Sequence, residues 1–370
     1  MTETSSATSM GTLPAGAAQG ESSPHSFSRL DGPGVARARR RRGRRRRWVI
    51  AALSVLVLAL CLTSLMVGHT VYSLDQVWDV IMGRPVDGAT FTVGTLRLPR
   101  MALALVAGAS FGLAGIAFQT LLRNPLASPD IIGISSGASA AAVFAIVVAN
   151  LSRTQVSLVA VAGGLIVAFA IYVLSAGGAG AGTRLILIGI GVAAMLNSVV
   201  AYLLERAGQW DYQEALRWLS GSLGGATWEA TVPVIVTLVL AGTLVVTQAR
   251  ALGLAQMGDE AAVGLGVRVP LMRIAVVMGA VALVSVATSA AGPIAFVAFL
   301  AGPIAVRLIG AHGSPVIPAA LVGAVLVLSA DLVGQWVFDT RYPVGVVTGA
   351  VGAPFLLYLI VSIHRKGGSL

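Results

Sequence analysis

The residues best suited to specific chemistry lie in a short polar segment of an otherwise apolar chain. Residues 253–268, GLAQMGDEAAVGLGVR, carry the acidic pair Asp259 and Glu260 in an amphipathic stretch interrupted by glycines. Glycines suit the tight turns that reverse a short helix, and small apolar side chains suit a groove on another protein. The segment therefore indicates a contact surface for a partner, with a plain solvated loop as the alternative. The predicted contact residues are Gly258, Asp259, Glu260, Ala261, Leu265 and Gly266.

Catalytic chemistry has no candidate residues in this sequence. A Walker A motif needs Gly followed by Lys and Ser or Thr, whereas the only lysine is Lys366, close to the end of the chain. The sequence contains no Ser/His/Asp set, no pair of intramembrane carboxylates and no HExxH motif. One cysteine, Cys61, excludes an internal disulfide, and four scattered histidines lack metal-ligand spacing. We therefore expect no catalytic residue, no metal site and no cofactor bound by this chain.

The composition identifies the class of protein. Of 370 residues, 56% are hydrophobic and only 11% are charged, and the mean hydropathy is +0.87. Soluble domains carry about 25% charged residues, so this is a polytopic membrane protein. The 44 glycines agree with this class, because small residues let membrane helices pack closely. The pairs Gly108 and Gly112, Gly133 and Gly137, and Gly345 and Gly349 have the spacing of such contacts.

Residues 1–47 form a segment of different character. The first part is rich in Ser, Gly, Ala and Pro, and ARARRRRGRRRR follows at 36–47. Ten arginines against three acidic residues give this tail +7 of the formal net charge of +10. We expect a disordered, arginine-rich cytoplasmic tail that is attracted to anionic lipid. Nucleic-acid binding is disfavoured because no aromatic residues are interleaved and a membrane span follows directly.

Ten apolar runs follow the tail and predict an all-α membrane domain over residues 48–370. Each run is continuously apolar, so helices are the expected spanning form. With the N-terminus in the cytoplasm, ten spans return the C-terminus, with Arg365 and Lys366, to the same side. The segment 253–268 then faces the cytoplasm. The runs lie near residues 48–67, 101–122, 132–150, 156–176, 185–204, 230–248, 271–291, 293–309, 316–337 and 343–363.

The order of the spans leaves an internal repeat open. Spans 2–5 and spans 7–10 could be corresponding groups of four, and because five spans separate their starts, the groups would have opposite orientations. The internal likeness is limited to glycine-rich helices such as LIGIGVAAMLNS and GVVTGAVGAPFL. The inverted repeat is therefore a hypothesis.

A translocation pathway is suggested by one amide in the fifth span. Asn197 is among the few strongly polar residues inside an apolar run. We expect it to face a pathway together with Gly191 and, from the tenth span, Thr348 and Gly349. The alternative for Asn197 is a hydrogen bond between helices.

Three arginines are predicted to stand near the outer mouth. Arg97 and Arg100 end the first outward loop, and Arg341 lies in the last outward turn. Anchors that snorkel to lipid head groups are the simpler interpretation of such residues. Asp331, near the outer end of the ninth span, is either a functional carboxylate or the partner of an arginine such as Arg341.

Four sequence motifs in a fixed order make the interpretation specific. They are RLPRMALALVAGASFGLAGIAFQTLLRNPLASPDIIGISSGAS at 97–139, GDEAAVGLGV at 258–267, GPIAFVAFLAGP at 292–303 and YPVGVVTGAVGAPFLLYLI at 342–360. Together they resemble the permease subunits of ABC importers for ferric siderophores, haem and cobalamin, the FecCD-like family. The resemblance covers nearly the whole chain after residue 48. AGPIAVRLIG at 301–310 departs from the pattern of many relatives and bears on the substrate subtype.

The resemblance implies a multi-subunit transporter in the cell (inner) membrane. A second permease chain, identical or homologous, would enclose a central pathway with this one. Two ATP-binding subunits, which carry ATP and Mg²⁺, would dock on 253–268, and an extracytoplasmic binding protein would deliver the ligand. In that family, arginines in the outer loops pair with acidic residues of the binding protein, which gives Arg97, Arg100 and Arg341 a docking role.

Three classes of function are carried forward. The favoured class is an importer permease, with a ferric siderophore as cargo and cobalamin or haem as the alternative. A secondary transporter is disfavoured because ionisable residues are scarce within the spans. A membrane enzyme or assembly factor is disfavoured because no reactive set of residues is present.

Overall fold

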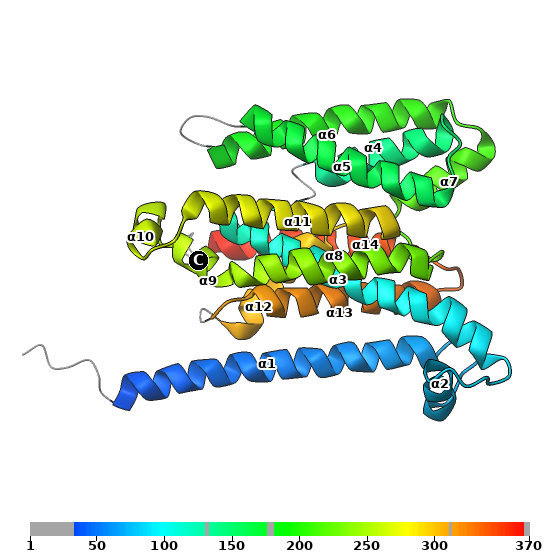
Figure 1. Cartoon of the computed structure of the whole chain (residues 1–370), viewed down its shortest axis with the longest axis horizontal. Coiled ribbons are helices and arrows are strands. Elements are labelled where there is room, and N and C mark those ends of the chain that lie inside the picture. The colour runs from blue at the N-terminus through cyan, green and yellow to red at the C-terminus, as the bar shows by residue number, and fades with distance from the viewer. Residues whose placement is uncertain (1–32, 130–132, 176–180, 311–312, 366–370) are drawn as a thin grey trace, which may run out of the picture. The chain divides into compact units, whose positions relative to one another are not determined.

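The computed structural model describes residues 33–129, 133–175, 181–310 and 313–365. By internal packing the chain divides into residues 1–41 and residues 42–370, and the larger unit carries the features described below. Every regular element among the described residues is a helix, which confirms the all-α prediction (Figure 1). The elements are α1 (Pro33–Met66), α2 (Leu74–Ile81), the π-helical η1 (Thr90–Arg97), α3 (Leu98–Leu121), α4 (Ile134–Val147), α5 (Arg153–Ser175), α6 (Ala181–Glu205), α7 (Gln209–Leu219), α8 (Trp228–Thr247), α9 (Ala249–Ala255), α10 (Asp259–Gly264), α11 (Val269–Ala291), α12 (Val297–Ile309), α13 (Val316–Trp336) and α14 (Val344–Arg365).

The apolar helices coincide with the predicted spans. In the described part of the chain, seven helices are long and apolar enough to cross a membrane, namely α1, α3, α5, α6, α8, α11 and α13. Two shorter apolar helices, Ile134–Val147 and Val297–Ile309, and the apolar part Val344–Leu359 of α14 lie in the remaining predicted runs. The helices α4 and α12 are shorter than the ~20 residues that a bilayer requires, so their ends must lie within the depth of the membrane or close to one surface.

Five short elements were not predicted from hydropathy. They are α2 and η1 after α1, α7 between α6 and α8, and α9 and α10 between α8 and α11. The start of α2 shows why such a segment is helical, because the side chain of Ser73 accepts from the amide of Gln76 and the Gln76 side chain accepts from the amide of Ser73. This reciprocal cap satisfies two free amides of the first turn. Segments of this length contain too few apolar residues to be recognised in a hydropathy count.

Helix α1 begins earlier than the first predicted span. It starts at Pro33, inside the segment 1–47 that the sequence predicts to be disordered. Proline is suited to the first position of a helix, and arginine has a high helix propensity. Residues 1–32 of the predicted tail lie outside the described residues, and the division into a tail and a membrane domain at residue 47 stays a prediction.

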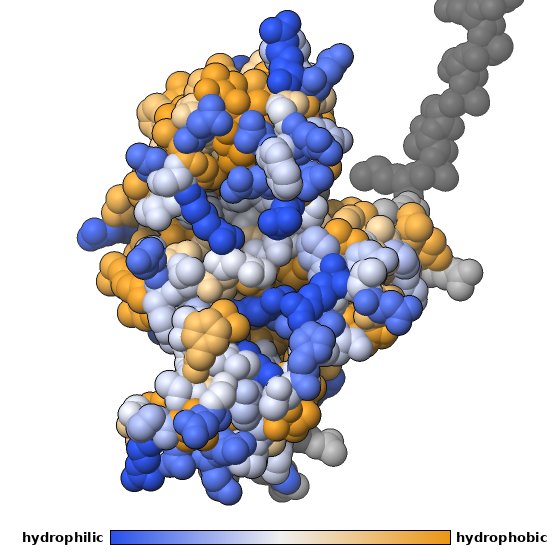
Figure 2. Space-filling model, turned by 90° about the vertical axis from the view of Figure 1, so that its right-hand side faces the viewer, coloured by the Kyte–Doolittle hydropathy of each residue, from blue (hydrophilic) through white to orange (hydrophobic). Residues whose placement is uncertain are grey.

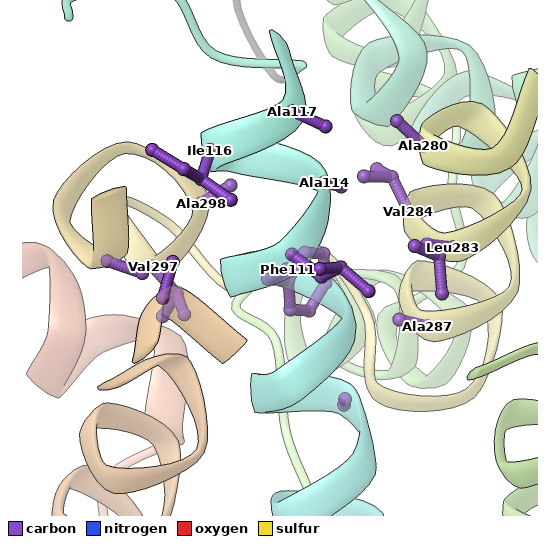
Figure 3. Packing of buried hydrophobic residues seen from close by; sticks show 14 of the residues in the cluster. Phe111, Ala114, Ile116, Ala117, Ala280, Leu283, Val284, Ala287, Val297 and Ala298 are labelled. Atoms are coloured by element: carbon purple, nitrogen blue, oxygen red, sulfur yellow. The ribbon is translucent and has the colours of Figure 1, made fainter. Parts of the chain in front are cut away.

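Helix α3 lies at the centre of the packing. Glycines bring its backbone close to α13, because a Cβ on Gly108 would lie 2.5 Å from the carbonyl oxygen of Gly323. Gly112 faces Ala319 and Gly323, and Gly115 faces Ala298 of α12 in the same way. On another side, buried residues of α3 pack against α11, with Val297 and Ala298 at the start of α12 opposite (Figure 3). The spacing of Gly108 and Gly112 thus marks a helix contact, as predicted.

The two groups of four helices make equivalent contacts. The groups are α3–α6 and α11–α14, in which α11 corresponds to α3 and α12 corresponds to α4. Helix α3 packs along α13, and in the same way α11 packs along α5. Helix α4 contacts α5 and α6, and in the same way α12 contacts α13 and α14. The short helices also begin alike, since Gly133 before α4 has φ 88° and Phe296 before α12 has φ 64°. This arrangement agrees with the inverted repeat that the span order leaves open.

Gly112 provides a test of this packing. Replacing Gly112 with Leu should lower the free energy of unfolding by about 1–3 kcal/mol, because the side chain would enter the contact between α3 and α13. Thermal unfolding of the detergent-solubilised protein measures the effect. Gly191→Leu is the matched control, because no atom lies within 4 Å of a Cβ built at Gly191. Equal melting temperatures for the two variants would contradict the assignment.

Candidate functional site

Two glycines shape the segment 253–268 as predicted. Helix α9 ends at Ala255, and α10 follows after a turn that contains Gly258, whose φ is 117°. Gly266, with φ 84°, lies in the turn that leads into α11. A Cβ at either position would meet no neighbour within 4 Å, so the backbone conformation, and not lack of space, favours glycine at both.

Asp259 has partners within the chain. Its carboxylate pairs with Arg123 at 2.7 Å and with Arg273 at 2.6 Å. Arg123 follows α3 and also donates to the carbonyl oxygen of Ala255 at 2.6 Å, while Arg273 lies in the first turns of α11. Asp259 was predicted as part of a contact with a partner protein. The geometry shows that it ties α10 to the end of α3 and to α11.

The remaining residues of α10 present an exposed face. We call Met257, Glu260, Ala261, Val263 and Leu265 the coupling surface; all five are exposed, whereas Ala262 is buried. Met257 is 72% exposed and Leu265 60% exposed, which is unusual for large apolar side chains outside a membrane span. The sequence interpretation missed Met257, whereas Val263 was among the small apolar side chains that it expected a partner's groove to accept. Because Ala262 is buried, it marks the face of α10 that packs against the protein, and its exposed neighbours lie on the other faces.

The three arginines that were predicted to stand near the outer mouth differ in their surroundings. Arg100 makes a bidentate pair with Asp331 of α13, with its Nη2 2.8 Å from Oδ1 and its Nε 3.1 Å from Oδ2. Asp331 is 3% exposed and also accepts from Gln335 at 2.8 Å. The arginine partner of Asp331 is therefore Arg100, and not Arg341 as the sequence suggested. The two oxygens of a carboxylate match the fork of a guanidinium, which fixes α3 against α13.

Arg97 is also engaged inside the chain. Its guanidinium donates to the carbonyl oxygens of Leu65, Met66 and Thr70 at 2.7–3.0 Å, and it lies over the ring of Tyr72 at 5.1 Å. These carbonyls belong to the end of α1 and the loop that follows. Arginine near a helix C-terminus satisfies carbonyls that have no partner within the helix.

Arg341 is the exposed member of the three. Its Nη2 lies 2.7 Å from Nε2 of His69, and its guanidinium lies 5.9 Å from the ring centre of Trp336. The end of residues 42–370 that carries α2 and α7 presents mainly hydrophilic side chains, with hydrophobic ones on its flanks (Figure 2). The docking role of the three arginines stays a prediction. By exposure, Arg341 is the one best placed to meet another protein.

A cavity of about 720 Å³ lies among α4, α6, α12 and α14. Asn197 of α6 lines it, as expected for a residue that faces a pathway. The wall also contains hydroxyl groups and two phenyl rings, and none of the described residues that line it is charged. Its polar and aromatic residues are Ser128, Ser135, Ser136, Ser139, Asn197, Phe296 and Phe299. The sequence interpretation missed the serines and the phenylalanines. It took the GISSG motif as a sign of helix packing and the GPIAF motif as a sign of the family, and neither was considered as a cavity wall.

The other predicted pathway residues do not line this cavity. Gly191 and Gly349 have open space where a Cβ would lie, so each leaves the surface of α6 or α14 uncovered. Thr348 is buried, and its hydroxyl donates to the carbonyl oxygen of Gly345 at 3.1 Å. Of the four residues, the structure places Asn197 in a cavity and Thr348 in helix packing.

Known proteins resemble this chain over most of its length. Residues 56–362 match the FecCD transport family. The chain is 38% identical over 303 residues to the ferric enterobactin transport system permease protein FepG of Escherichia coli, covering 81% of this chain and 91% of that protein. It is 39% identical over 312 residues to the achromobactin transport system permease protein CbrC of Dickeya dadantii, covering 83% and 89%. It is 36% identical over 280 residues to the cobalamin import system permease protein BtuC of Halobacterium salinarum, covering 74% of each.

A solved structure is similar to the fold. It is described as a metal-chelate type ABC transporter in an inward-facing conformation, with a TM-score of 0.75 and 25% identity. The match covers 85% of this chain and 99% of the other. The helical arrangement is therefore that of a known transporter subunit.

The pair of Arg100 and Asp331 gives a prediction for stability. Asp331→Ala should lower the free energy of unfolding by up to about 3 kcal/mol, because it leaves a largely buried guanidinium without its carboxylate. Thermal unfolding in detergent measures the change. Arg341→Ala, which removes an exposed side chain, should shift the melting temperature much less. A small effect of Asp331→Ala would show that the pair does not hold α3 to α13.

Proposed function

The chain belongs to the FecCD transport family, and from this premise we propose that it moves ferric-siderophore complexes into the cytoplasm as the permease subunit of an ATP-driven importer. It is a multi-pass membrane protein. The siderophore cargo is supported by two relatives, FepG and CbrC, which the chain matches over 91% and 89% of their length. Cobalamin is the second candidate, because a permease of a cobalamin import system is also similar.

The proposed pathway runs beside α6 and α14. The apolar span of α6 is mostly uncovered within the chain, and Gly191 and Gly349 leave open space on α6 and α14. A second permease chain, identical or homologous, would cover these faces and enclose the pathway between the two copies. The cavity at Asn197 would then open toward the cargo. Its hydroxyls, amide and phenyl rings suit a large ligand that has both polar and aromatic groups.

The proposed ATPase contact is the coupling surface. Two ATP-binding subunits, each with ATP and Mg²⁺, would receive Met257, Val263 and Leu265 in a groove, as an amphipathic helix is received by a partner. The observation that carries this proposal is that α10 is exposed on one face and ion-paired to α3 and α11 through Asp259 on the other. A displacement of α10 by the ATPase would therefore act on two spanning helices.

The proposed orientation follows from charge. Arginines occur at both ends of the spans, but among the described residues only the end that carries α9 and α10 also has the arginine cluster 44–47, because Arg45 donates to the carbonyl oxygen of Leu308 at the end of α12 at 3.2 Å. This cluster agrees with a cytoplasmic location of that end. Both termini would then be cytoplasmic. At the opposite end, the extracytoplasmic binding protein would contact Arg341, while Arg97 and Arg100 would hold the loops in position.

A charge reversal on the coupling surface tests the ATPase contact. Glu260→Arg should reduce copurification of the ATPase subunit and slow uptake, whereas thermal stability should change little because the side chain is exposed. Glu214→Arg on α7 is the matched control, since Glu214 is an exposed acidic residue at the other end of the membrane helices. Normal ATPase binding and uptake by Glu260→Arg would refute the contact.

Uptake of labelled cargo tests the function itself. Cells or proteoliposomes that contain the permease, the ATPase and the binding protein should accumulate iron supplied as a ferric siderophore, and excess unlabelled siderophore should compete. Accumulation should cease when the ATPase is inactivated by substitution of its Walker A lysine. Accumulation of labelled cobalamin instead of iron would replace the siderophore proposal by its alternative.

A further inference from the structure

A second cavity, of about 920 Å³, lies at the end of the membrane helices where α9 and α10 are located (Figure 1). It is bounded by the end of α8, by α9, by the turn after α10 and by the first turns of α11. Two arginines, Arg250 and Arg268, line it together with the polar residues Thr247 and Gln248. Among the described residues, no aspartate or glutamate lines it. This cavity is separate from the one that contains Asn197.

The two arginines give the cavity an uncompensated positive charge. Both are exposed, and neither forms an ion pair within the described residues. Arg123 and Arg273 at the same end differ, because Asp259 pairs with both. The cavity therefore suits an anion.

An apolar wall continues from the arginines along α11. Leu271, Ile274 and Met278 line the cavity and are exposed, at a spacing that places them along one face of the helix. Ten residues separate Arg268 from Met278, which corresponds to about 15 Å along a helix. This wall belongs to the apolar span Val269–Ala291. A free phosphate ion has no apolar part that could contact this wall, whereas a lipid has both a charged head group and acyl chains.

We propose that this cavity binds an anionic phospholipid. The phosphate of the head group contacts Arg250 and Arg268, and an acyl chain lies along Leu271, Ile274 and Met278. Basic pockets between membrane helices are suited to anionic head groups. A soluble ATPase subunit cannot cover Met278, because that residue lies within the apolar span. The lipid site does not depend on the proposed function; only its assignment to the cytoplasmic leaflet does.

The proposed lipid site also borders the segment 253–268, which contains α10. Leu265, Gly266 and Val267, which follow α10, line the same cavity. A bound lipid therefore contacts the turn after α10 and the helices α8 and α11 at once. It stabilises the position of α10 in which the coupling surface is presented.

Lipid binding to the purified full-length chain tests the proposal. Native mass spectrometry measures retention of phosphatidylglycerol against phosphatidylcholine from mixed micelles. The double variant Arg250→Gln/Arg268→Gln should retain phosphatidylglycerol at least about tenfold more weakly than the unmodified chain. The control Arg206→Gln/Arg217→Gln removes two exposed arginines at the end that carries α7 and should retain the lipid normally.

Two further measurements distinguish other occupants. Met278→Asp should weaken retention although both arginines are present, because it places a charge on the acyl-chain wall. Competition by inorganic phosphate at low millimolar concentration would overturn the proposal in favour of a soluble anion. A double variant that retains phosphatidylglycerol but loses its paired permease chain would overturn it in favour of a contact between copies. Equal retention by both double variants would also overturn it. None of these readouts requires uptake, so failure of the lipid site and failure of the importer proposal are distinguishable.

Discussion

The close contact of α3 with its neighbours is the constraint on which the rest of the structure depends. Near one end, Arg100 pairs with the buried Asp331 of α13, and in the middle, glycines bring the two backbones together. Farther along, the side-chain amide of Gln119 donates to the carbonyl oxygen of Phe299 at 3.0 Å, and Phe299 lines the cavity at Asn197. After its last turn, Arg123 pairs with Asp259. One helix and the residue that follows it thus contact Asp331 near one end, the cavity wall, and the segment 253–268 at the other end.

This continuity gives the proposed transport cycle a physical path. Small residues let α3 and α13 pack without long side chains between them, so a displacement at one end is not absorbed by rearranged rotamers. An ATPase that prefers one position of α10 would supply a difference in contact energy between two arrangements of the spanning helices, which is what shifts access from one side to the other. The hydrogen bond from Gln119 connects that shift to α12, and hence to the cavity wall. Through its pairs with Arg123 and Arg273, Asp259 would be the link by which the shift enters the membrane helices.

The sequence predicted the spans well because each span must satisfy its own backbone and must be apolar over its length. It did not predict α2 or α7, and for α9 and α10 it indicated only a short helix reversed by glycine turns, because short amphipathic segments carry little hydropathy signal. Ion pairs were harder to predict from the sequence. Arg100 and Asp331 are 231 positions apart, and hydropathy does not indicate which distant residues are in contact. For the same reason the two ion pairs of Asp259 were not predicted; its side chain is nevertheless 43% exposed, so its contact with a partner stays a prediction. The glycine turns at Gly258 and Gly266 were predictable, because a positive φ favours one residue type.

The nucleotide dependence of thiol reactivity at position 197 tests the central claim, that Asp259 transmits ATPase movement through α3 and α11. The measurement uses Asn197→Cys in a Cys61→Ser background within the assembled importer. The labelling rate should differ between the nucleotide-free and ATP-trapped states. In Asp259→Asn this difference should disappear while the ATPase remains bound, because the substitution weakens both ion pairs and leaves the exposed coupling surface in place. An unchanged nucleotide dependence in Asp259→Asn would contradict the account.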